Sequence, residues 1–141
     1  MYQKILVALD NSSTDRAMFA HITELAKVHH SELLLLHVSD GWAARNYNRF
    51  QLAASEEMKD DRAYLETVAT ELQAQGLTVK AQLALGDPAR GILKTAETEG
   101  CDLIAMTTHG HRFFKDLLYG STITQVRHQA KVPVLLVNVA R

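Results

Sequence analysis

The sequence predicts a doubly wound α/β fold, in which a five-stranded parallel sheet carries helices on both faces. Five apolar runs alternate along the chain with stretches whose apolar residues recur at helical spacing. Strands that alternate with helices pair in parallel through right-handed crossovers, and strands this apolar need a cover on both faces. Because no repeat or linker interrupts the series, we expect residues 1–141 to form a single domain.

The first strand is predicted over residues 4–9 (KILVAL), and a helix follows it. Ser12 or Ser13 is the expected N-cap of that helix, and Asp15 falls in its first turn, where a carboxylate complements the helix dipole. The buried face is predicted to contain Met18, Ile22, Leu25 and Ala26, and His29 and His30 close the helix.

The second strand is predicted over residues 32–38 (ELLLLHV). We expect a loop at residues 39–53, which contains Trp42, Tyr47 and Phe50 and is longer than most strand-to-helix connections. It is interpreted either as a lid or partner surface or as a plain surface loop. A long helix ends at Gly76, and its apolar stripe is Met58, Leu65, Val68, Ala69 and Leu72.

The second half of the chain continues the alternation. Residues 77–85 form the predicted third strand, after which Gly86, Asp87 and Pro88 supply a turn, an N-cap and a first helical position. Ile92, Leu93 and Ala96 are the expected buried face of that helix. The remaining elements are a fourth strand at 101–107 (CDLIAMT), a helix from about Ser121 to Ala130 and a fifth strand at 132–139.

Composition excludes several classes of function. The net charge of -1, from 15 basic and 16 acidic residues, supplies no field that would attract nucleic acid or an anionic membrane. No apolar run approaches the roughly 20 residues of a membrane helix, so we expect a cytoplasmic protein. Cys101 is the single cysteine, which leaves no disulfide framework or thiolate cluster, and no metal site is predicted.

Glycines after the fourth strand suggest a binding loop. In doubly wound sheets, ligands bind beyond the carboxyl ends of the strands. Gly110, Gly120, Ser121 and Thr122 would suit a cradle of N–H groups at a helix N-terminus, although an ordinary loop with Ser121 as N-cap fits equally well. The segment GDPARGI lacks the Lys and Ser/Thr of a P-loop, and no G-x-G-x-x-G follows the first strand.

Four segments together resemble the universal stress proteins over the whole chain: KILVALDNS, GDPARGIL, CDLIAMTTHG followed by nine residues and GS, and KVPVLLV. The family's ATP-binding pattern, G-x2-G-x9-G-[S/T], falls on Thr107, Gly110, Gly120 and Ser121. Thr107 departs from it, and a β-branched residue resists a positive φ. The resemblance implies the strand order 3-2-1-4-5, with the switch point between strands one and four.

The resemblance also implies an ATP site, with or without Mg²⁺. Asp10 would lie beside the ribose or phosphates, and Asn11 replaces a glycine common in the family at little cost, since Asn tolerates the left-handed region. The implied adenine slot consists of Ala8, Val38 and Met106, and the implied phosphate contacts are Gly110, His111, Gly120, Ser121 and Thr122.

The expected function is that of a nucleotide-dependent regulator in a stress response, acting on an unknown protein partner. No activated nucleophile or carboxylate pair is recognisable, which argues against a turnover enzyme. A homodimer is predicted through the apolar fifth strand, at Val134–Val137. The alternatives are a nucleotide-free stress protein that acts by protein contacts, and a slow ATPase or nucleotidyl transferase.

Overall fold

Five parallel strands form one sheet in the order β3-β2-β1-β4-β5, which confirms the predicted fold class and strand order. The computed structural model describes residues 1–40, 47–108 and 116–139. The elements in chain order are β1 (Lys4–Ala8), α1 (Asp15–His29), β2 (Glu32–Asp40), α3 (Tyr47–Gln73), β3 (Thr78–Gly86), α4 (Pro88–Thr98), β4 (Leu103–Thr108), α5 (Asp116–Gln129) and β5 (Val134–Asn138).

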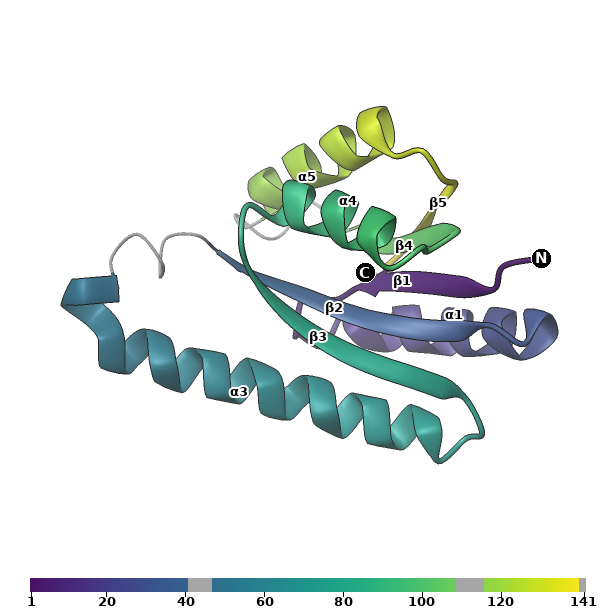
Figure 1. Ribbon diagram of the computed structural model, residues 1–141, viewed down its shortest axis with the longest axis horizontal. Coiled ribbons are helices and arrows are strands. Elements are labelled where there is room, and N and C mark those ends of the chain that lie inside the picture. Colours follow the sequence, from purple (N-terminus) through teal and green to yellow (C-terminus); the bar gives the residue numbers. More distant parts are fainter. Residues whose placement is uncertain (41–46, 109–115, 140–141) are drawn as a thin grey trace.

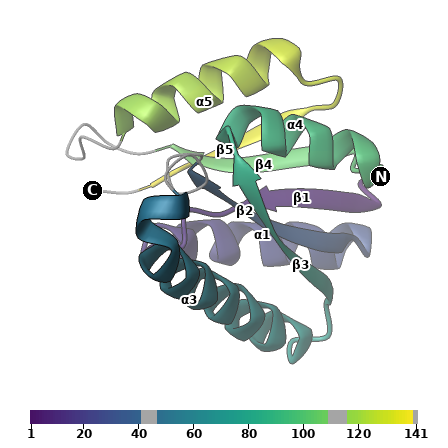
Figure 2. The same ribbon diagram turned by 60° about the vertical axis from the view of Figure 1, so that its left-hand side comes forward.

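Helices cover both faces of the sheet, with α1 and α3 on one side and α4 and α5 on the other (Figures 1 and 2). Successive side chains of β1 alternate between these two layers: Ile5 and Val7 join the core under α1 and α3, and Leu6 joins the core under α4 and α5. Both cores therefore draw on the same strand, which explains why β1 is apolar from Ile5 to Ala8.

Several helix ends follow the local signals in the sequence. Asp87 caps α4 by accepting a hydrogen bond from the Arg90 N–H at 3.0 Å, and Pro88 occupies the first turn. Gly76 has φ of 88° in the turn after α3. His30 takes the left-handed conformation with φ of 55° as the C-cap of α1.

Three predicted boundaries were wrong. The expected loop at 39–53 is shorter, because β2 pairs with β3 as far as Asp40 and α3 already begins at Tyr47, in a segment rich in helix-forming Gln, Leu and Ala. Helix α1 has Thr14 as its N-cap, without a side-chain hydrogen bond. Helix α5 begins at Asp116 instead of Ser121, since an acidic residue followed by two leucines is a good first turn.

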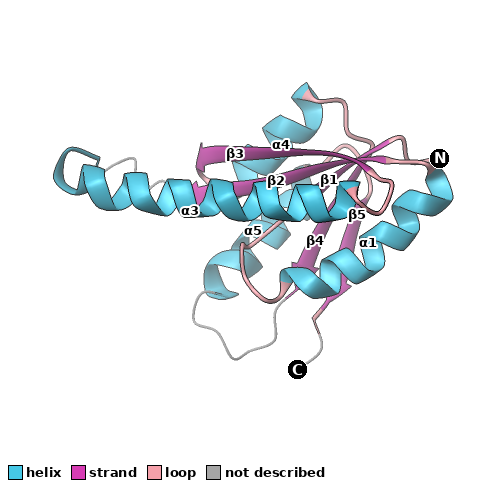
Figure 3. Ribbon diagram, turned by 90° about the horizontal axis from the view of Figure 1, so that it is seen from below, coloured by secondary structure: helices cyan, strands magenta, loops and turns pink. Residues whose placement is uncertain are grey.

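The long helix α3 runs past the end of the sheet, so its first turns project beyond the body of the domain (Figure 3). Among the helices that the structure describes, none is both long and apolar enough to span a membrane.

Candidate functional site

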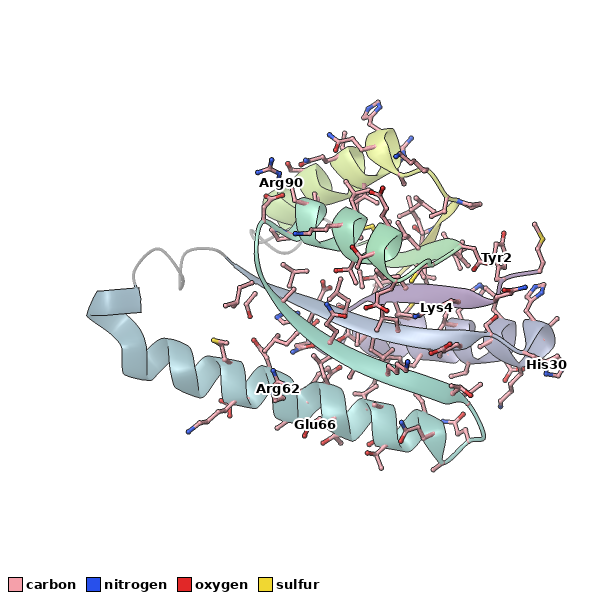
Figure 4. The ribbon with its side chains drawn as sticks, viewed as in Figure 1. Tyr2, Lys4, His30, Arg62, Glu66 and Arg90 are labelled. Atoms are coloured by element: carbon pink, nitrogen blue, oxygen red, sulfur yellow. The ribbon has the colours of Figure 1, made fainter. Side chains whose placement is uncertain are left out.

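A pocket opens at the carboxyl ends of the strands, on the face of the sheet covered by α4 and α5. Arg90 at the start of α4 marks this end of the molecule in Figure 4, and Tyr2 and His30 mark the opposite end. The pocket lies between β1 and β4, where the strand order reverses, and this is where ligands bind in open α/β sheets. It is lined by Ala8, Leu9, Asp10, Leu36, Val38, Pro88, Ile92, Met106, Thr107 and Thr122.

Six of the ten residues predicted from the sequence line this one pocket: Ala8, Asp10, Val38, Met106, Thr107 and Thr122. They come from four separate elements and from the β1–α1 loop. The three apolar residues assigned to an adenine slot lie among them, and the Asp10 carboxylate adds an acceptor. The residues missed were Leu9, Leu36, Pro88 and Ile92, which had been assigned to the core or to a helix start.

Two of the other four predicted residues, Gly120 and Ser121, do not lie at the helix N-terminus that the expected cradle requires. Gly110 and His111 lie outside the described residues. Gly120 and Ser121 lie within α5, and Ser121 is exposed. Since α5 begins at Asp116, the amides of Ser121 and Thr122 lie beyond the first four N–H groups that a helix leaves unpaired. The premise of a helix N-terminus at Ser121 was therefore wrong.

Thr107 does not carry the backbone strain expected of it. It lies within β4, where it is paired with Val137 of β5, and its φ is not positive. A β-branched residue is well suited to such an extended conformation. Its side chain is buried and forms part of the pocket wall.

The β1–α1 loop is organised by Asp15, a fully buried carboxylate at the start of α1. It accepts hydrogen bonds from the Asp10 N–H at 3.0 Å, the Ser12 N–H at 3.3 Å and the Tyr64 hydroxyl at 2.8 Å. Burial raises the pKa of the Asp15 carboxyl above its ordinary value, against the opposing effect of these donors. Asn11 has φ of 57°, which confirms that it takes the left-handed conformation.

The floor of the pocket depends on a close approach of α4 to β2. A Cβ placed on Gly91 would lie 3.0 Å from Cγ2 and 3.2 Å from Cγ1 of Val38. Glycine at this position lets the first turn of α4 lie directly over a pocket residue. Gly91 was not singled out from the sequence, because a glycine in GDPARGI has no local pattern that reveals a tertiary contact.

The model of the universal stress protein family matches residues 1–138. The chain belongs to the universal stress protein family. A relative in this family, universal stress protein MJ0577 of Methanocaldococcus jannaschii, is 30% identical over 155 residues, covering 98% of this chain and 96% of the relative. A solved structure of MJ0577 superposes with a TM-score of 0.83 at 31% identity, covering 100% of this chain and 99% of that one.

Two other solved universal stress proteins are each described in complex with a nucleotide. One, in complex with cAMP, has a TM-score of 0.70 at 19% identity and covers 99% of this chain and 98% of its own. The other, from Archaeoglobus fulgidus in complex with dAMP, has a TM-score of 0.70 at 18% identity and covers 96% of this chain and 98% of its own. At these identities the likeness is one of fold.

The side chains around the pocket are suited to binding a ligand. The apolar walls can enclose a flat ring, and the Asp10 carboxylate can accept hydrogen bonds from ligand hydroxyls. Across the described residues there is no group of three or more His, Cys, Asp or Glu side chains that could hold a metal ion. Cys101 lies just before β4, and burial raises the pKa of its thiol to about 11, which keeps it protonated at neutral pH.

Proposed function

We propose that this universal stress protein binds ATP in the pocket between β1 and β4 and acts as a nucleotide-dependent regulator in a stress response. The observation that carries the proposal is the convergence of six predicted nucleotide-contacting residues on one pocket at the switch point of the sheet. The cAMP and dAMP complexes of two proteins with this fold support a nucleotide as the class of ligand.

The pocket offers each part of a nucleoside a suitable surface. Ala8, Val38 and Met106 form apolar walls for the base, and Asp10 provides an anionic acceptor for ribose hydroxyls or for a phosphate-bound Mg²⁺. Thr122 adds a polar side chain from α5. These residues are suited to binding a nucleotide. A regulator acts through the difference between its nucleotide-bound and nucleotide-free states and does not require catalytic turnover of the nucleotide.

Asp10→Ala should lower ATP affinity far more than it lowers stability. In the free protein, Asp10 Oδ2 accepts a hydrogen bond from Thr14 Oγ1 at 3.1 Å, in a half-exposed loop. Loss of a charge-assisted hydrogen bond to the ligand costs about 1.5–3 kcal/mol, so we expect ATP to bind about 10- to 100-fold more weakly in calorimetric titrations.

Ser13→Ala is the matched control, because Ser13 is exposed in the same loop and does not line the pocket. It should bind ATP as the unmodified protein does. If Asp10→Ala instead lowered the melting temperature sharply while ATP affinity stayed the same, Asp10 would be a structural residue and its assigned role in the pocket would be wrong.

We also propose that the protein forms a homodimer through β5. This strand is at one edge of the sheet, and its segment Val134–Val137 is apolar and only half-buried. The other edge strand, β3, carries exposed Lys80, a charge that discourages pairing with another chain. An unprotected apolar edge is stabilised by pairing with a second copy of the same strand.

Leu136→Glu should weaken this self-association. A charge on the apolar strand is desolvated when two copies pair, so sedimentation velocity at micromolar concentration should show a shift from dimer to monomer. Asn138→Asp, a charge at the exposed end of the same strand, serves as the control. A monomer of the unmodified protein under these conditions would overturn the dimer proposal without affecting ATP binding.

A further inference from the structure

Asp61 on α3 contacts two segments that bear pocket residues. Its Oδ1 accepts a hydrogen bond from Asn11 Nδ2 at 3.0 Å, and its Oδ2 accepts one from Ser39 Oγ at 3.2 Å. Asn11 directly follows Asp10, and Ser39 directly follows Val38, and both Asp10 and Val38 line the pocket. A single side chain of α3 therefore holds the immediate neighbours of two pocket residues.

These contacts are made on the face of the sheet opposite the pocket. Side chains alternate along β2, so Leu36 and Val38 line the pocket while His37 and Ser39 turn toward α3. His37 Nδ1 lies 2.9 Å from the carbonyl oxygen of Leu9, and its Nε2 lies 3.5 Å from Asp61 Oδ2. The backbone on both sides of Val38 is thereby tied to α3 and to the end of β1.

The contact with Asn11 supports an uncommon backbone conformation. Asn11 has φ of 57°, a region that few non-glycine residues occupy, although Asn tolerates it better than most. Its amide nitrogen also lies 3.4 Å from the Asp61 carbonyl oxygen, whereas its Oδ1 is buried with no hydrogen-bond partner in the described structure. The side chain is therefore held through its Nδ2 by Asp61, and with it the chain direction just after Asp10.

We propose that Asp61 is a positioning residue for the pocket, through which α3 on one face of the sheet is coupled to the ligand on the other. The effect on ligand affinity rests on the proposed nucleotide binding. Coupling of this kind is reciprocal. A ligand that fixes Asp10 and Val38 also holds α3 more firmly, and loss of the Asp61 contacts lowers the affinity for the ligand. Arg62, the next residue, marks this level of α3 in Figure 4.

The test compares Asp61→Asn with Asp60→Asn, which removes the same charge from the exposed neighbouring position. In the free protein, hydrogen exchange should become about tenfold faster for the amides of residues 10–14 in Asp61→Asn, as expected when about one hydrogen bond is lost, and should not change in Asp60→Asn. In calorimetric titrations with ATP, Asp61→Asn should bind about tenfold more weakly and Asp60→Asn as the unmodified protein does.

A rescue separates positioning from a general loss of stability. Glycine adopts positive φ without side-chain support, so Asn11→Gly in the Asp61→Asn background should restore most of the ATP affinity. Should Asp61→Asn fail to fold, Ser39→Ala is a smaller change that removes one of the two hydrogen-bond donors to the Asp61 carboxylate. It should lower ATP affinity about threefold, the lower end of the effect of one hydrogen bond.

The outcomes distinguish this inference from the proposed function. If the unmodified protein binds no ATP but the loop exchanges faster in Asp61→Asn alone, nucleotide binding fails and the positioning role stands. If ATP binds Asp61→Asn and the unmodified protein equally and loop exchange is unchanged, the positioning role is overturned and nucleotide binding stands. Equal effects of Asp61→Asn and Asp60→Asn would also overturn it, because they would reflect charge alone.

Discussion

Replacement of Asp15 by alanine should destabilise the protein by about 2–4 kcal/mol, because it leaves buried hydrogen-bond donors unpaired. The carboxylate is fully buried and accepts from the amides of Asp10 and Ser12 and from the Tyr64 hydroxyl. Chemical denaturation followed by circular dichroism measures the change. Glu24→Ala, at an exposed position of the same helix, should have a small effect, and an equally small effect of Asp15→Ala would contradict the assigned role.

The cost of this substitution should depend on pH in a defined direction. Since burial raises the pKa of Asp15 in the folded state above its ordinary value of 3.8, the folded protein retains the proton longer than the unfolded chain does. The contribution of Asp15 to stability is therefore fully present below the ordinary pKa and declines as the pH rises through the folded pKa. The difference in stability between the unmodified protein and Asp15→Ala should accordingly be larger at acidic than at neutral pH, and a difference that grew toward neutral pH would contradict this assignment.

Gly91→Val should impair the pocket and the fold together. The added Cβ alone would lie 3.0 Å from Val38 Cγ2, so either Val38 moves into the pocket or the first turn of α4 moves away from β2. Overpacking of this kind costs about 1–3 kcal/mol of stability, and we expect ATP affinity to fall more than about tenfold because both displaced surfaces line the site.

A second substitution tests the cause of that effect. Val38→Ala in the Gly91→Val background removes the two methyl groups that the new side chain meets, and it should recover a large part of the lost stability. Lys94→Val introduces the same β-branched residue at an exposed position of α4 and controls for helix propensity. If Lys94→Val were as damaging as Gly91→Val, the close approach to Val38 would not be the reason.

The fold could be predicted because its information is local. The five apolar runs correspond to the five strands, and signals such as Asp87–Pro88 and Gly76 lie at real helix boundaries. The strand order came from the family resemblance, since periodicity alone does not determine which strands are neighbours. The start of α5 was misplaced because glycine before serine looks like a helix start, although glycine is tolerated inside a helix at a cost of about 1 kcal/mol.

The candidate site was predictable where the family resemblance assigns its residues. Asp10 and Thr107 lie at strand ends that the family pattern identifies. By contrast, Asn11 and Asp61 meet across 50 positions of sequence, and Tyr64 and Asp15 across 49, so no spacing rule connects them. Gly91 matters because of a side chain on another element. Such contacts follow from tertiary packing, which a single sequence does not reveal.

The most direct test of ATP binding at the switch point is a titration of the unmodified, isotope-labelled protein with ATP, followed through its backbone amide resonances. The account predicts saturable shifts concentrated at residues 8–10, 36–38, 106–107 and 122, which surround the pocket. Residues at the opposite end of the strands, such as Tyr2 and His30, should change little. An absence of shifts at millimolar ATP, or shifts confined to residues away from the pocket, would contradict it.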